Sequence, residues 1–215
     1  MKRGKSYLAA ALLLIAVGAP ALRADTVRNH FDSDAMMREP GFFDFVVLGA
    51  PGKARWMILS DMNPPSTPYI LAQTEASRPP DSIAAALRRN QSFQDGAVTT
   101  FLRRGPGRSG LLLRMADERT FLVLLVDTAT GEAVLSGYRE GKASELGRGR
   151  AALDRGWEQF GVVAAGPKVS VLFNGEPLFE AVDPAPAAGR TGVATAGPNE
   201  ARFDEFVIET GPAGP

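Results

Sequence analysis

The chain has 215 residues but no cysteine and only one histidine, His30. Without cysteine there is no disulfide, no thiolate metal ligand and no cysteine nucleophile. His30 lies in a polar, irregular segment near the amino terminus, which excludes a Ser-His-Asp triad and a histidine-based zinc site. The fold must therefore be stabilised by a hydrophobic core. About 190 residues are enough to bury such a core in a single domain.

The sequence also lacks an excess of charge of one sign, since 24 Lys and Arg balance 24 Asp and Glu. Without residues 1 to 24 the balance becomes 20 basic and 24 acidic residues. Such a chain has no basic surface for nucleic acid or for an anionic membrane. We therefore expect no nucleic-acid partner and no membrane binding of the mature chain.

The amino terminus has the three segments of a secretory signal in the required order. Basic residues Lys2, Arg3 and Lys5 precede an apolar run from Tyr7 to Val17, and small residues end at Ala24. The run is shorter than the roughly 20 apolar residues of a membrane span. The sequence predicts a signal peptide over residues 1–24, with an uncleaved anchor as the alternative. We expect export to a bacterial periplasm or to the exterior.

The rest of the chain is typical of an antiparallel all-β domain. Its segments are short, β-branched or aromatic, and are bounded by Gly, Pro, Asn or Asp. We expect a linker over 25–41, one two-sheet β-sandwich over 42–210 and a disordered tail over 211–215. The expected strands are 43–48, 56–60, 69–74, 83–88, 93–103, 110–115, 120–127, 132–138, 157–164, 168–174, 176–182, 190–195 and 201–209.

Three local patterns refine this interpretation. Asn174 and Gly175 separate two apolar runs and predict a tight hairpin, since both residues tolerate a positive φ. The spacing Gly105-x-Gly107-x-x-Gly110 matches a dinucleotide fingerprint, but a strand rather than a helix follows it, so we reject that function. Ser82 to Arg89 has apolar residues at helical spacing, and residues 145–155 are typical of an edge strand flanked by loops.

Several blocks occur in an order that resembles the concanavalin A-like sandwich domains. The blocks are SFQDGAVTTFLRR, GLLLR followed by AD, Gly156-Trp157, VSVLFNGEPLF, AGRTGVAT and ARFDEFVIE. The resemblance is to the bacterial group related to the 3-keto-disaccharide hydrolase (DUF1080) and to laminin-G-like modules. This resemblance implies a jelly-roll fold. It implies that Ser82 to Arg89 form a strand rather than a helix. It also implies that Phe203 faces the core and that Asp204 holds a loop.

One acidic pattern of hydrolases with this fold is missing. A Glu-x-Asp-x-x-Glu run on one strand would place its carboxylates on one face, near the separation that a retaining glycosidase needs. No such run occurs in the sequence, so no catalytic residue is assigned. Calcium is common in such sandwiches, but no dense Asp/Asn loop is present. We expect no cofactor, with calcium as the alternative.

The resemblance also implies a sugar site on the strand that follows Gly-Leu-x-x-Arg. The group's pattern there runs roughly Asp-Pro-Asn-Asn-Tyr-Tyr-x-x-Arg-x-Asn. In this chain Arg114 and Asp117 match, Leu125 replaces the Arg, and Asp127 stands at the Asn position. Arg114 could clamp sugar hydroxyls, or it could pair with a neighbouring carboxylate such as Asp95.

Trp56 and Trp157 complete the candidate ligand contacts, because aromatic faces can stack on sugar rings. For both tryptophans the alternative is a place in the core. The predicted ligand-binding residues are thus Arg114, Asp117, Asp127, Trp56 and Trp157.

The leading hypothesis is an exported, non-catalytic module that binds carbohydrate or a glycan surface. One alternative is a glycoside hydrolase for disaccharides or keto-disaccharides, with Arg114, Asp117 and Asp127 near the site. A second is a structural domain whose Phe121, Leu122 and Leu124 face is covered by a protein partner.

Overall fold

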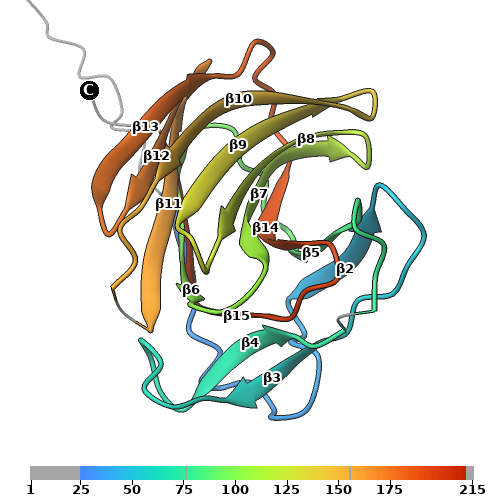
Figure 1. Ribbon diagram of the computed structural model, residues 1–215, viewed down its shortest axis with the longest axis vertical. Helices are drawn as coiled ribbons and strands as arrows, with labels where there is room; N and C mark the ends of the chain where they lie inside the picture. Colours follow the sequence, from blue (N-terminus) through green and yellow to red (C-terminus); the bar gives the residue numbers. More distant parts are fainter. Residues whose placement is uncertain (1–24, 76, 155, 212–215) are drawn as a thin grey trace, which may run out of the picture.

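The computed structural model describes residues 25–75, 77–154 and 156–211. The predicted signal peptide and most of the predicted tail lie outside these residues. The described residues form two antiparallel sheets that face each other (Figure 1). Sheet A runs in the order β13 (Glu176–Val182), β12 (Lys168–Phe173), β11 (Trp157–Ala165), β6 (Gly96–Arg103), β15 (Ala201–Thr210), β4 (Tyr69–Gln73) and β3 (Trp56–Ser60), and β1 (Asp25–Asn29) pairs with β15. Sheet B runs in the order β10 (Lys142–Arg150), β9 (Glu132–Arg139), β8 (Thr120–Asp127), β7 (Arg108–Asp117), β14 (Arg190–Ala196), β5 (Ile83–Arg88) and β2 (Phe43–Leu48).

The core fills the space between the sheets. Alternate side chains of each strand point into it, as the two-residue period of a strand requires. On β8 these are Leu122, Leu124 and Val126. On β15 they include Phe203 and Phe206, where a bulge between Asp204 and Val207 shifts the alternation by one residue. Trp56 joins the same cluster.

The outer face of sheet B is also apolar, which is unusual for a face turned away from the core. It is built by Val46, Leu48, Ile83, Ala85, Leu87, Leu112, Met115, Phe121, Val123, Leu125, Tyr138 and Ala194. All of these belong to sheet B itself, and several, such as Leu112 and Ala85, have no exposed surface. The sheet is strongly curved (Figure 1). We conclude that this curvature lets side chains from different strands bury one another.

The predicted strands correspond to strands of the structure, with ends that coincide or differ by at most three residues. The segment after Ser82 is strand β5, as the resemblance implied. Residues 145–155 overlap β10, which is an edge strand of sheet B but begins earlier, at Lys142. The predicted linker differs from the structure, because residues 25–29 form β1 and pair with β15 from Asp25↔Thr210 to Asn29↔Phe206.

The hairpin and the glycine pattern agree with the predictions. Asn174 and Gly175 have φ values of 50° and 86°, which are the positive values that a tight two-residue turn requires. The glycine pattern is followed by strand β7, so it opens no helix. None of the described residues forms a helix with the length and hydropathy that a bilayer crossing needs.

Candidate functional site

Arg114 lies on β7, three residues before the strand ends, and is almost fully buried, at 2% exposure. Its guanidinium donates to Asp183 Oδ2 at 2.8 Å, to Asp95 Oδ1 at 3.2 Å and to the carbonyl oxygens of Gln94 and Gly166, both at 2.8 Å. The ion pair with Asp95 was the alternative interpretation of this residue and is confirmed. Arg114 therefore ties β7 to three other segments of the chain.

Asp117 and Asp127 lie at opposite ends of the β7–β8 hairpin. Asp117 pairs in register with Thr120, whereas Asp127 pairs with Arg108. Each carboxylate accepts backbone N–H groups of its own turn, from Arg119 at 2.7 Å for Asp117 and from Ala129 and Thr130 for Asp127. At about 3.3 Å per step, the seven steps from Thr120 to Asp127 along β8 span about 23 Å. One sugar ring cannot contact both carboxylates.

The two tryptophans lie on different faces of sheet A. Trp56 is fully buried in the core, where its ring stacks on Phe45 with centroids 6.1 Å apart. Trp157 is 9% exposed and packs with Ile70 and Ala72 in a separate cluster. The core interpretation holds for Trp56. For Trp157 it needs correction, because the ring lies outside the space between the sheets.

The five predicted ligand contacts are thus not brought together in one site. The apolar face proposed for a protein partner also needs correction. Leu122 and Leu124 belong to the core between the sheets, while Phe121 belongs to the outer face of sheet B. Neighbouring residues of a strand point to opposite sides, so these three side chains cannot form one surface.

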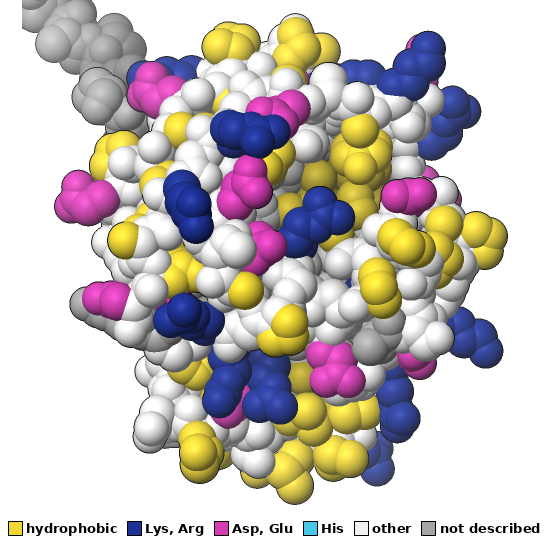
Figure 2. Space-filling view, in the orientation of Figure 1, with side chains coloured by type: hydrophobic (Ala, Val, Ile, Leu, Met, Phe, Trp, Pro, Cys, Tyr) yellow, Lys and Arg dark blue, Asp and Glu magenta, His cyan; other side chains and the backbone are white. Residues whose placement is uncertain are grey.

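A pocket of about 430 Å³ opens at one end of the outer face of sheet B. We call it the sheet B pocket. In Figure 2 hydrophobic side chains gather in a recess at the upper right, where Figure 1 places the ends of β8 to β10 beside the segment after β2. The lining combines Phe121 and Tyr138 with Asp81, Glu118 and Arg119. The last three are exposed and form a polar edge around an apolar floor.

Phe121 and Tyr138 form the floor as a stacked aromatic pair. Their ring centroids are 4.4 Å apart and their planes differ by 14°. Phe121 is buried beneath, at 1% exposure, while Tyr138 is half-buried. Burial raises the pKa of the Tyr138 hydroxyl. A tyrosine hydroxyl is a neutral hydrogen-bond donor at neutral pH even without that shift. The sequence predicted strands over 120–127 and 132–138, which contain Phe121 and Tyr138. It could not predict the recess, because the recess arises from the curvature of the sheet.

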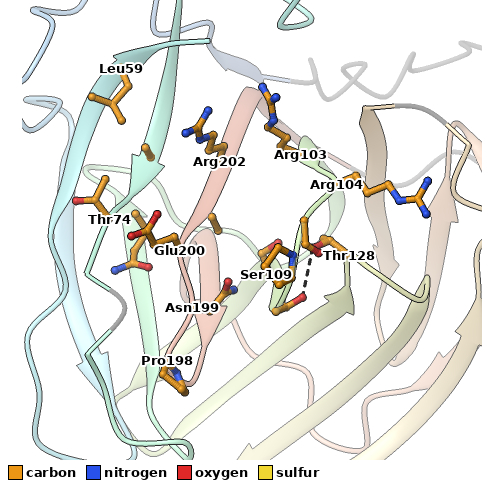
Figure 3. Close-up of a pocket in the computed structure, with 16 residues that line it drawn as sticks. Leu59, Thr74, Arg103, Arg104, Ser109, Thr128, Pro198, Asn199, Glu200 and Arg202 are labelled. Carbon is orange, nitrogen blue, oxygen red and sulfur yellow. Dashed lines mark hydrogen bonds between the residues drawn. The ribbon is translucent and has the colours of Figure 1, made fainter. Parts of the chain in front are cut away.

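A second pocket, of about 490 Å³, lies over the outer face of sheet A at the end formed by the β6–β7 and β14–β15 loops. We call it the arginine pocket. Figure 3 shows Arg103 and Arg202 beside each other at one side, with Thr74 and Glu200 at another. Arg104 also lines it. The sequence contains no motif for this site, because its residues come from strands far apart in the chain.

The loop after β3 is fixed against this side of sheet A. Asp204 is fully buried and accepts hydrogen bonds from Ser66 N at 2.7 Å, Ser66 Oγ at 3.0 Å and Glu205 N at 2.7 Å. Asp204 thus holds a loop and Phe203 faces the core, as predicted for the closing strand. Burial raises the pKa of Asp204 to about 6.

Within the described ranges, no three His, Cys, Asp or Glu side chains are grouped so that they could hold a metal ion. Calcium ligation by backbone carbonyls would need a loop that supplies several oxygens at once.

No family model and no curated protein matches the chain. Solved structures do resemble it. The carbohydrate-binding module CBM66 from Bacillus subtilis matches with a TM-score of 0.54 and 13% identity, over 79% of this chain and 94% of that one. A protein of unknown function with a galectin-like fold, also from Bacillus subtilis, matches with a TM-score of 0.53 and 15% identity, over 79% and 91%. A prokaryotic β-1,3-1,4-glucanase (lichenase) from a mouse hindgut metagenome matches with a TM-score of 0.51 and 11% identity, over 87% and 99%. The fold is therefore a concanavalin A-like β-sandwich, which is shared by carbohydrate-binding modules and glycoside hydrolases.

Proposed function

We propose that the protein is an exported carbohydrate-binding module that holds a sugar in the sheet B pocket. The observation that supports this most directly is the stacked pair Phe121 and Tyr138 on the floor of that pocket. Small-molecule sites combine an apolar lining with a few polar groups that orient the ligand. A sugar ring presents both kinds of surface, with C–H groups on its faces and hydroxyls around its edge.

The polar edge of the pocket can serve those hydroxyls. Asp81 and Glu118 are acceptors for hydroxyl protons, and Arg119 is a donor to ring or hydroxyl oxygens. Arg119 is partly fixed already, because its Nη2 donates to the carbonyl oxygen of Glu140 at 2.7 Å. Tyr138 adds a hydroxyl that forms no hydrogen bond to another described residue. These groups favour orientation of a neutral ring rather than attraction of a charged one.

The hydrolase alternative, and with it the relation to the 3-keto-disaccharide hydrolase group, receives less support. It needs Arg114, Asp117 and Asp127 near one scissile bond, yet Arg114 is engaged within the chain and the two carboxylates cap opposite turns.

Binding to soluble polysaccharides tests the proposal. Affinity electrophoresis of the full mature chain against glucans, galactans, xylans and fructans should show retardation by at least one of them. Tyr138→Ala should then weaken binding by about one to two decades, and Tyr138→Phe by less, since it keeps the ring. Phe42→Ala removes an aromatic ring that is 60% exposed elsewhere and is the matched control. Binding that Tyr138→Ala leaves unchanged would refute this site.

Export is the second part of the proposal. The signal-like order of residues 1–24 supports it, and cleavage after Ala24 would leave β1, which begins at Asp25, intact. Expression of the full chain in a bacterium, followed by intact-mass measurement of the periplasmic fraction, should find a product that begins near Asp25. A product that keeps Met1 or Lys2 would contradict export with cleavage.

A further inference from the structure

The arginine pocket contains two cations that the sheet forces side by side. Trp157 on β11 pairs in register with Arg103 on β6. Phe203 on β15 pairs with Leu102, so the next residue of each strand places Arg202 opposite Arg103. Like charges directly opposite each other on neighbouring strands destabilise a sheet. The arrangement therefore needs a compensating negative charge.

Asp61 supplies part of that compensation. It bonds to Nη1 of Arg103, and its Oδ2 accepts from Nη1 of Arg202 at 2.8 Å. The side chain of Asp61 is only 3% exposed, whereas those of Arg103 and Arg202 are 34% and 43% exposed. The buried carboxylate of Asp61 thus fixes both guanidiniums from the protein side. Each arginine keeps N–H groups that face solvent.

The pair still carries one uncompensated positive charge. Burial and the neighbouring charge of Arg202 both lower the pKa of Arg103. Arg104, on the edge of the same pocket, has no ion pair with another described residue. An oxyanion placed between the two forks could accept several charge-assisted hydrogen bonds, which are stronger than neutral ones. Because Asp61 already orients both side chains, little side-chain entropy remains to be lost.

The surroundings of the pair favour an oxyanion carried on a saccharide. The Arg103 guanidinium lies over the Trp157 ring, 5.9 Å from its centroid, and Trp157 lines a neighbouring hollow together with Met62 and Arg103. On the other side Thr74 and Glu200 line the arginine pocket. Glu200 would repel a bare anion at its own position but accepts protons from hydroxyls.

We propose that the arginine pocket is a second binding site, specific for an acidic saccharide. The carboxylate or sulfate of the sugar binds between Arg103 and Arg202, and its hydroxyls face Thr74 and Glu200. This site lies on sheet A, away from the sheet B pocket, and does not depend on the function proposed there.

Isothermal titration calorimetry of the full mature chain tests this proposal with three probes. Trigalacturonate carries carboxylates, glucose 6-sulfate carries a sulfate, and maltotriose is neutral. At least one acidic probe should bind ten-fold or more tightly than maltotriose, with affinity that falls as NaCl rises. Which of the two binds identifies the oxyanion.

Variants then locate the site. Arg202→Gln should weaken acidic-probe binding by about 10- to 100-fold. Arg202→Lys keeps a positive charge that can pair with Asp61 but loses the planar guanidinium fork. This variant should therefore fold, and it should bind the acidic probe about ten-fold more weakly than the wild type. Arg148→Gln, which removes an equally basic but 60% exposed side chain from β10, is the matched control, and Tyr138→Ala should leave this binding unchanged.

Three outcomes would overturn the proposal. They are no acidic-probe binding at about 10 mM, equal affinity for maltotriose, and affinity that Arg202→Lys and Arg202→Gln both leave unchanged.

Discussion

Asp204 shows how one buried carboxyl can make stability depend on pH. Its pKa is about 6 in the fold, against 3.8 for an unperturbed Asp, because burial disfavours the charged form. Between these values the folded chain holds a proton that the unfolded chain has released. Stability from this group is therefore fully present below about pH 4 and is lost as the pH rises to about 6.

We predict that Asp204→Asn costs more stability at pH 4 than at pH 7. The pKa difference corresponds to about 3 kcal/mol at most. Urea unfolding of the wild type and the variant at both pH values measures the change directly. Equal costs at the two pH values would show that Asp204 is ionised in the fold at both.

Arg114 is the residue for which we predict the largest loss of stability. Replacement by Met leaves Asp183, which has no exposed surface, with Arg139 as its remaining ion-pair partner. Removing one member of a buried pair typically costs about 3 to 5 kcal/mol. Arg148→Met breaks only exposed pairs with Glu132 and Glu145 and should leave the urea midpoint nearly unchanged, because solvent screens exposed ion pairs. Similar urea midpoints for the two variants would contradict the structural role of Arg114.

The partners of Arg114 show what the sequence could and could not predict at this scale. Asp95 was predictable as a partner because it belongs to the sequence block SFQDGAVTTFLRR, which directly precedes the block that contains Arg114. Asp183 lies 69 residues further along the chain, and no local pattern connects the two. The same reason hides the pairing of Arg103 with Arg202.

At the scale of elements, the β12–β13 hairpin depends on Asn174. Besides its positive φ of 50°, its N–H donates to the carbonyl oxygen of Gln159 at 2.9 Å and its Oδ1 accepts from Gln159 N at 3.0 Å. Proline would fix φ near −65° and remove the N–H. We predict a cost of more than about 2 kcal/mol for Asn174→Pro.

Asn174→Gly is the control for that prediction, because glycine keeps the positive φ and loses only the side-chain bonds. It should cost about 1 kcal/mol. Thermal unfolding of both variants separates backbone geometry from side-chain bonding, and equal melting temperatures would argue against the turn conformation.

Strands β5 and β1 show where element prediction reaches its limit. In β5, Ala84 and Ala86 face the core while Ile83, Ala85 and Leu87 face the outer cluster. Both faces are buried, so the two-residue alternation disappears and the segment has no periodic signal that separates strand from helix. In β1 the residues are mostly polar and exposed, and only pairing with β15 makes them a strand.

At the scale of the whole molecule, the two sheets present different outer faces. Sheet B curves around its own apolar side chains, while sheet A carries an arginine pair over a buried carboxylate. The sequence predicted two sheets because turn residues bound each strand. Neither recess was predictable, since each depends on curvature and on register between distant strands.

The positions of Asp117 and Asp127 on sheet B argue against glycoside hydrolysis. Acid and base attack on a glycosidic bond needs two carboxyl groups no more than roughly 10 Å apart. Asp117 and Asp127 are separated by about the length of β8, about 23 Å. We therefore expect no measurable hydrolysis of common disaccharides or of their 3-keto forms by the protein. Reducing-sugar release over a long incubation, with Asp117→Asn and Asp127→Asn measured in parallel, provides the test. Turnover that disappears in either variant would show that these carboxylates act in catalysis, and the protein would then be a glycoside hydrolase.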